Sequence, residues 1–208
     1  MVFIKASALL SIITAVAAAP VGTPMETALT LDAVKPVPNS NVPWKNGAIN
    51  ANNNKFWIGK PSVVECITNQ PCPQPEKAQM VLYNTEKKLS LKVGVLGDQQ
   101  IFVDKNGALV YLIPRDPLPQ VAYGSDAWGL TETPNKSDIA NVYNQQVLVW
   151  YACPQTSATK TQGPWQVFAD TRQHLVADQD VPSGHKDDCT IFGLQTQFST
   201  PLWYNNGN

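Results

Sequence analysis

Short segments rich in β-branched and aromatic residues, each bounded by Gly, Pro, Asn or Asp, recur along most of the chain. No window sustains an apolar period of 3.6 residues over a dozen positions, so we expect little helix beyond the N-terminal leader. Many short strands with regular turn signals are typical of an all-β sandwich or closed barrel, and this is the fold we predict. A β-trefoil is the alternative, but no clear threefold repeat supports it. The expected strands are 26–34, 55–60, 78–84, 89–96, 99–104, 108–114, 146–154, 164–170 and 189–198.

The stretch "DQQIFVDKNGALVYLIP", residues 98–114, resembles both a calcium loop and a hairpin. With Gly107 at position 6 of a calcium-binding loop, positions 1 and 12 would be Phe102 and Ile113, and neither supplies a side-chain oxygen. Asn106-Gly107 instead offers the positive-φ positions of a tight turn between two apolar strands. We therefore predict a β-hairpin and no metal site.

At the start of the chain one lysine precedes an apolar run that ends in small residues, which is the layout of a secretory signal peptide. The run from Ala6 to Ala19 is shorter than the roughly 20 apolar residues that span a bilayer. We expect cleavage after Ala18, with a cut after Ala17 as the alternative, and a soluble, exported product. The expected organisation is a signal peptide at 1–18, an N-terminal strand with an Asn/Pro-rich loop or linker at 19–54, one all-β domain at 55–198 and a polar tail at 199–208.

The formal net charge of −1 argues against nucleic acid and anionic membrane surfaces as partners, because both call for a basic patch. Charged residues make up only 15% of the chain. Polarity is carried instead by Asn, Gln, Ser and Thr, as in proteins of extracellular matrices and walls. Cell-wall polysaccharide is therefore the partner we consider.

Four cysteines entering an oxidising compartment are expected to form disulfides, and four allow three pairings. We favour Cys66–Cys72, which closes the small loop "CITNQPC", together with Cys153–Cys189. The close CxxC spacing of a metal site is missing. The sequon "NKS" makes Asn135 the expected glycosylation site.

The most enzyme-like cluster is "SGHKDDC", which places His185, Asp187 and Asp188 beside Cys189. A turn before a disulfide cysteine explains these residues without catalysis, and the other histidine, His174, has no motif. Neither a G-x-S-x-G elbow nor an H-E-x-x-H motif is present. A glycosidase would need two carboxylates facing each other across a cleft. For a hydrolase of wall glycans, the only candidates we name are Asp104, Asp170, His185 and Asp187. We expect no catalytic residue and no cofactor.

The six tryptophans raise the question of sugar binding, since an exposed indole can stack on a sugar ring. Trp150 and Trp165 lie in strongly apolar segments and are expected in the core. Trp44, Trp128 and Trp203 lie in expected loops or the tail and are the candidates for carbohydrate contact. A carbohydrate-binding, lectin-like module is therefore the alternative to a structural role.

Several blocks of the sequence are similar to the fungal cell-wall proteins of the PhiA family, named for the phialide and known also among IgE-binding mould antigens. The resemblance runs from about residue 55 to 195. It implies a secreted wall protein of asexual spore-bearing cells, without catalytic residues; a secreted effector or general surface antigen is the other role a relative could have. The blocks that carry it are "KFWIGKP" (55–61), Cys66 with Cys72-Pro73, "DQQIFVDKNGAL" (98–109), "ACP" (152–154), "WQVFA" (165–169), "DVPSG" (180–184) and "DC" (188–189).

Overall fold

The computed structural model describes residues 26–36, 41–45, 47–63, 76–92, 99–133 and 136–198. These residues form a β structure with three short 3-10 helices, as expected from the lack of helical periodicity. The strands are β1 (Glu26–Val34), β2 (Ile49–Asn52), β3 (Lys55–Ile58), β4 (Gln79–Tyr83), β5 (Lys88–Leu91), β6 (Gln99–Val103), β7 (Leu109–Tyr111), β8 (Trp128–Thr133), β9 (Lys136–Asn144), β10 (Val147–Pro154), β11 (Trp165–Thr171) and β12 (Thr190–Phe198); the 3-10 helices are η1 (Ser157–Thr159), η2 (Asp178–Asp180) and η3 (Lys186–Asp188).

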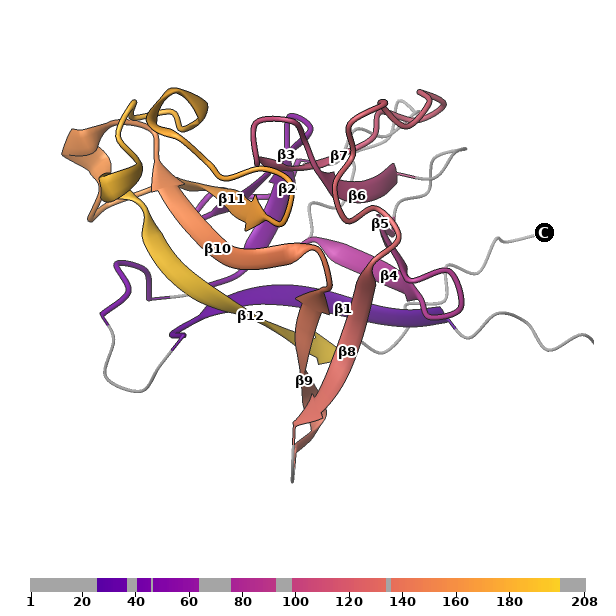
Figure 1. The fold of residues 1–208 in the computed structure, drawn as a ribbon. Coiled ribbons are helices and arrows are strands. Elements are labelled where there is room, and N and C mark those ends of the chain that lie inside the picture. The colour runs from indigo at the N-terminus through magenta and orange to yellow at the C-terminus, as the bar shows by residue number, and fades with distance from the viewer. Residues whose placement is uncertain are drawn as a thin grey trace, which may run out of the picture.

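Nine strands close into an antiparallel barrel in the order β1-β4-β5-β6-β7-β3-β11-β10-β12 (Figure 1). Pairing of β1 with β12, from Leu29 opposite Phe198 to Val34 opposite Gly193, completes the circle. Within this circle of nine strands, closure leaves no strand edge open to pairing with other chains. The predicted closed barrel is therefore confirmed.

The barrel begins N-terminal to the boundary expected at Lys55. β1 pairs on one side with β4 and on the other with β12, and it buries Leu29 and Leu31 completely. β2, within the expected Asn/Pro-rich loop, pairs with β3 outside the closed circle. Both strands thus belong to the same folded unit as the rest of the sheet.

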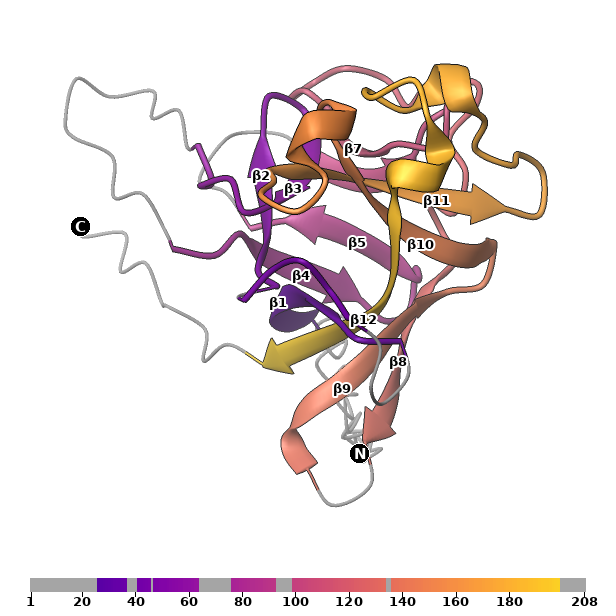
Figure 2. The ribbon, with the colours of Figure 1, turned by 90° about the vertical axis from the view of Figure 1, so that its left-hand side faces the viewer.

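β8 and β9 form a hairpin that continues the sheet from β12 and projects away from the barrel (Figure 2). The sequence did not predict either strand. Trp128, at the base of this hairpin, is 1% exposed and stacks with Trp150 at 5.9 Å between ring centroids. The hairpin is therefore anchored in the barrel core at its base.

The "DKNG" segment is the predicted hairpin turn between β6 and β7. Gly107 has φ +81°, and its N–H donates to the carbonyl of Asp104 at 3.0 Å. The Asp104 carboxylate accepts the N–H groups of Asn106 and Ala108, both at 2.9 Å. Asn106, contrary to expectation, has no positive φ: the loop is a turn followed by a left-handed glycine, a common form of longer hairpin loop.

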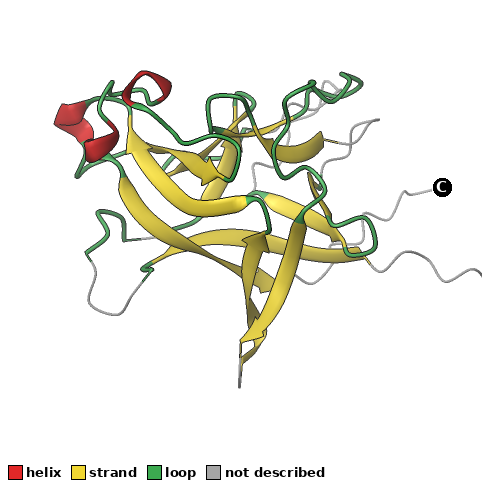
Figure 3. Ribbon diagram, viewed as in Figure 1, coloured by secondary structure: helices red, strands yellow, loops and turns green. Residues whose placement is uncertain are grey.

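The paired positive-φ conformation occurs instead at Asn53 (φ 51°) and Asn54 (φ 59°), in the two-residue turn between β2 and β3. The 3-10 helices gather at one end of the barrel (Figure 3). Across the described ranges, no helix has the length and apolar character that a membrane span would need.

Candidate functional site

The outer face of β11 carries Gln166, Phe168 and Asp170 in alternation. The residues between them belong to the barrel core, and side chains alternate between the faces of a strand, so these three face outward. They are nevertheless buried, at 2%, 2% and 7% exposure. Another segment must therefore cover this face of the barrel.

That segment is residues 172–189, which we call the covering loop. Its Val176 and Val181 pack with Phe168 and Cys153 into a second, smaller hydrophobic core outside the barrel. The disulfide Cys153–Cys189 ties the end of the loop to β10. The predicted pairing of these two cysteines is confirmed.

Asp170 links the covering loop to the sheet by hydrogen bonds. Its carboxylate accepts from Tyr151 Oη at 2.8 Å, from the Val176 N–H at 2.8 Å and from Lys186 Nζ at 3.0 and 3.1 Å. Lys186 Nζ also lies 4.7 Å from the centroid of the Tyr151 ring. Asp170 therefore holds both ends of the covering loop against β11.

These contacts shift three pKa values. Burial alone would raise the pKa of Asp170, but the bonds from Tyr151, Val176 and Lys186 outweigh it and hold that pKa below its usual value. Burial would likewise lower the pKa of Lys186, yet the Asp170 carboxylate raises it. Burial and the bond to Asp170 both raise the pKa of Tyr151. Asp170 and Lys186 are therefore held in their charged forms, as expected of a structural ion pair.

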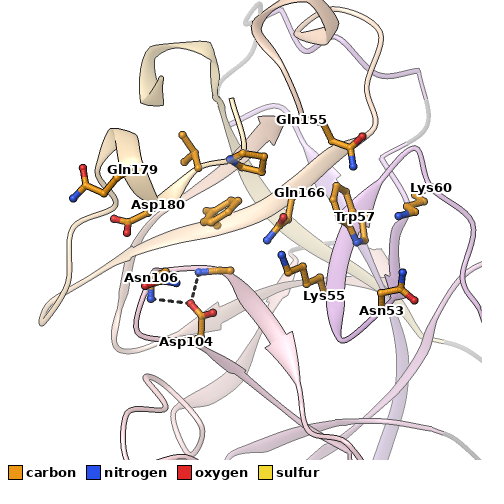
Figure 4. A pocket seen from close by; sticks show the side chains of 14 residues that line it. Asn53, Lys55, Trp57, Lys60, Asp104, Asn106, Gln155, Gln166, Gln179 and Asp180 are labelled. Atoms are coloured by element: carbon orange, nitrogen blue, oxygen red, sulfur yellow. Dashed lines mark hydrogen bonds between the residues drawn. The ribbon is translucent and has the colours of Figure 1, made fainter. Parts of the chain in front are cut away.

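An open groove of about 570 Å³ lies between the covering loop and the β2–β3 turn, over the outer face of β11 (Figure 4). We call it the Gln166 groove. Gln166 and Lys55 point toward each other across its middle, and Asp104 and Asp180 lie on its other side (Figure 4). Amides predominate among its polar side chains. It is lined by Asn53, Lys55, Trp57, Lys60, Asp104, Asn106, Ala108, Gln155, Gln166, Phe168, Gln179, Asp180, Val181 and Pro182.

The two acids of the groove are already engaged. Asp104 fixes the hairpin turn, and Asp180 accepts the Ala177 N–H at 2.8 Å while lying 3.4 Å from His174 Nε2. With two lysines and two aspartates, the formal charge of the lining is balanced when both lysines are protonated. The groove thus has no strong preference for either sign of charge.

A second hollow of about 550 Å³ lies beside β1 and β12. The ion pair between Lys77 and Asp32, at 3.1 Å, lies on its border. Trp44 contributes to it but is only 8% exposed, and its indole N–H donates to the Ala33 carbonyl at 3.1 Å. This hollow therefore offers a ligand neither a free indole donor nor an exposed aromatic face.

The structure does not bring the four candidates for hydrolysis into one site. Asp104 lies in the Gln166 groove, whereas Asp170 is bound to Lys186 and Tyr151 beneath the covering loop. His185 and Asp187 lie exposed at and in η3. Within the described ranges, no group of three or more His, Cys, Asp or Glu side chains is arranged to hold a metal ion.

Two predictions of carbohydrate contact are wrong. Trp44 packs edge-on against Trp165 and Phe192, and Trp128 is buried and donates to the Ile101 carbonyl at 3.3 Å. Polar neighbours in the sequence made both resemble loop residues, but the fold places them inside. The predicted burial of Trp150 and Trp165 is confirmed, at 8% and 4% exposure.

The remaining predicted positions lie outside the described residues: Cys66, Cys72, Asn135, Trp203 and the leader at 1–18. The groove's central residue, Gln166, was not foreseen. Its only signal in the sequence is an amide at an outward position of the apolar strand "WQVFAD".

The fold and the groove define a disulfide-linked, closed β-barrel protein with a polar site on its outer face. The model of the PhiA-like secreted protein family matches residues 37–202, so the chain belongs to this family and is a secreted protein. No curated protein and no solved structure shows a significant match to it.

Proposed function

We propose that the chain is a non-enzymatic protein of the fungal cell wall, contributing to the wall of spore-bearing cells. The observation that carries the proposal is the state of the candidate acids. Asp104 and Asp170 accept hydrogen bonds that hold the fold, and Asp187 stands apart on the exposed η3. A glycosidase needs two carboxylates about 5–10 Å apart across a cleft, available to substrate and water.

Membership in a secreted family supports the extracellular part of this proposal. The architecture suits a long-lived structural protein: the barrel closes on itself, and a disulfide fixes the covering loop. A role in phialide and spore development follows from the family resemblance.

Fractionating fungal cultures tests the wall location. Washed walls, cytosol and medium are probed with an antibody to the chain, with a cytosolic enzyme as control for lysis. We expect the protein in the wall fraction, resistant to high salt. Retention inside the cell would refute the proposal.

Deletion of the gene tests the developmental role, which we expect to appear as malformed phialides and fewer conidia. Incubating purified protein with glucan, chitin and mannan tests the absence of enzymatic activity, and we expect no release of reducing ends. Release that disappears in Asp104→Asn would show a hydrolase instead.

A further inference from the structure

Gln166 is a polar residue on the outer face of β11. It is 2% exposed, and no hydrogen bond to its side-chain amide exists in the part of the chain that the structure describes. The little surface it keeps opens into the Gln166 groove. Its amide atoms are not among the fully enclosed polar atoms that lack a partner, so they remain open to the groove, where water or a ligand can bond to them.

Packing alone does not explain an amide at position 166. Gln166 lies opposite Trp57 of β3 and Cys153 of β10. Phe168, two residues further along the same face, fills the second core with an apolar side chain. An apolar residue would suit position 166 equally well for packing. The amide therefore fits a bound molecule that supplies both a donor and an acceptor.

The rest of the groove narrows the class of that molecule. Balanced charge argues against a strongly anionic or cationic ligand. Lys60 Nζ lies 4.4 Å from the centroid of the Trp57 ring, and Trp57 is 6% exposed, so stacking on an indole is not the main mode of recognition. What the groove offers is amides, at Asn53, Asn106, Gln155, Gln166 and Gln179.

We infer that the Gln166 groove binds a short segment of an uncharged wall polysaccharide, with the Gln166 amide bonded to sugar hydroxyl or acetamido groups. Sugar hydroxyls donate and accept at the same atom, which matches an amide that needs both partners. The volume of the Gln166 groove, about 570 Å³, lies within the range of small-ligand sites, about 300–1,000 Å³. The choice of polysaccharide over a neutral peptide rests on the proposed wall location.

Binding to soluble oligosaccharides tests the inference. Purified mature protein is titrated with laminarihexaose and with chitohexaose by calorimetry, and the two sugars distinguish a β-glucan from a chitin segment. We expect one of them to bind and Gln166→Leu to weaken that binding at least tenfold. The melting temperature of free Gln166→Leu should stay close to that of the wild type, because the amide opens into the groove and makes no hydrogen bond within the described part of the protein.

The matched control is Gln197→Leu, an exposed glutamine beside the second hollow, which should bind as the wild type does. If Gln166→Leu fails to fold, the double variant Gln155→Ala/Gln179→Ala replaces it, since both residues are exposed on the groove rim. Binding of neither sugar, or equal binding by the folded groove variant, would overturn the inference.

An uncharged peptide of Ser, Asn and Gly serves as the competing ligand. Binding of this peptide in place of both sugars would also overturn the inference. A protein found in the wall that binds no sugar refutes only the groove assignment. A protein that binds sugar through Gln166 but is absent from the wall refutes only the proposed function.

Discussion

Lys186 Nζ lies 3.0 Å from Asp170 Oδ2 on the outer face of the barrel. The two residues come from the covering loop and from β11, and the Cys153–Cys189 disulfide closes beside them. One wall of the Gln166 groove, residues 179–182, belongs to the same loop. The shape of the groove therefore depends on this ion pair.

Asp170→Asn should destabilise the protein by about 1–3 kcal/mol at pH 7, since it leaves the Lys186 ammonium without its carboxylate. The folded-state pKa of Asp170 is lowered, so its contribution is full above the ordinary value of 3.8 and is lost as the pH falls through the folded pKa. The gap between wild type and variant should therefore narrow as the pH falls below about 4.

Urea unfolding at pH 7 and at a series of acidic pH values measures this gap. Asp187→Asn, an exposed neighbour in η3, is the control and should change stability little. A gap that stays constant into strong acid would contradict the assignment.

Replacing both Cys153 and Cys189 by Ala should lower stability by about 3–4 kcal/mol, because the bridge closes a loop of 36 residues in the unfolded chain. The covering loop should lose hydrogen-exchange protection at Val176 and Val181, while the β1–β12 ladder keeps its own. Uniform loss of protection in both regions would show that the loop and the barrel unfold together.

Gly107→Ala should destabilise by about 1–3 kcal/mol, because a residue with a β-carbon is strained at φ +81°. The added atom would also come within 2.5 Å of Val176 Cγ2. Gly184→Ala separates the two effects, since Gly184 has φ +76° and no atom within 4 Å of the new β-carbon. We expect Gly184→Ala to lose less stability than Gly107→Ala in urea unfolding. Equal losses of stability would show that Val176 moves aside freely.

Calcium should leave the melting temperature unchanged, because the Asp104 carboxylate binds two backbone N–H groups of its own turn. Melting curves in millimolar calcium and in EDTA should overlap. A rise with calcium that Asp104→Ala abolishes would show a calcium loop instead, since a ligand specific for the folded state stabilises it.

Lys87→Gly should stabilise the turn between β4 and β5. Lys87 has φ 53°, which costs a non-glycine residue about 1–2 kcal/mol, and part of this gain is offset by the flexibility of glycine when unfolded. We expect a net gain of about 0.5–1 kcal/mol in thermal or chemical unfolding. Glu86→Gly, at a neighbouring position without positive φ, should destabilise, which excludes a general benefit of glycine in this turn.

The fold class could be predicted because apolar residues at short strand spacing leave few other ways to form a core. β2 was missed because its "INAN" has the composition of a loop. Its Asn50 and Asn52 are buried, yet their amides donate to the Lys60 and Pro61 carbonyls at 2.9 and 3.0 Å. Only the tertiary structure supplies those partners.

The Gln166 groove could not be predicted for a related reason. It depends on the register between β11 and β3 and on the covering loop, which unite residues from 53 to 182. The Cys153–Cys189 disulfide, in contrast, could be predicted because four cysteines allow only three pairings. Tryptophan burial was predicted only where the neighbouring residues were apolar as well.

Barrel closure by β1 and β12 has a mechanical consequence. The two strands are antiparallel, so Leu29, early in β1, lies opposite Phe198 at the end of β12. A force pulling the two ends of the domain apart would break the β1–β12 hydrogen bonds in sequence. The first to break would be those beside Leu29 and Phe198. Such a force would therefore open the barrel at this seam before disturbing the covering loop, whose far end is tied covalently to β10.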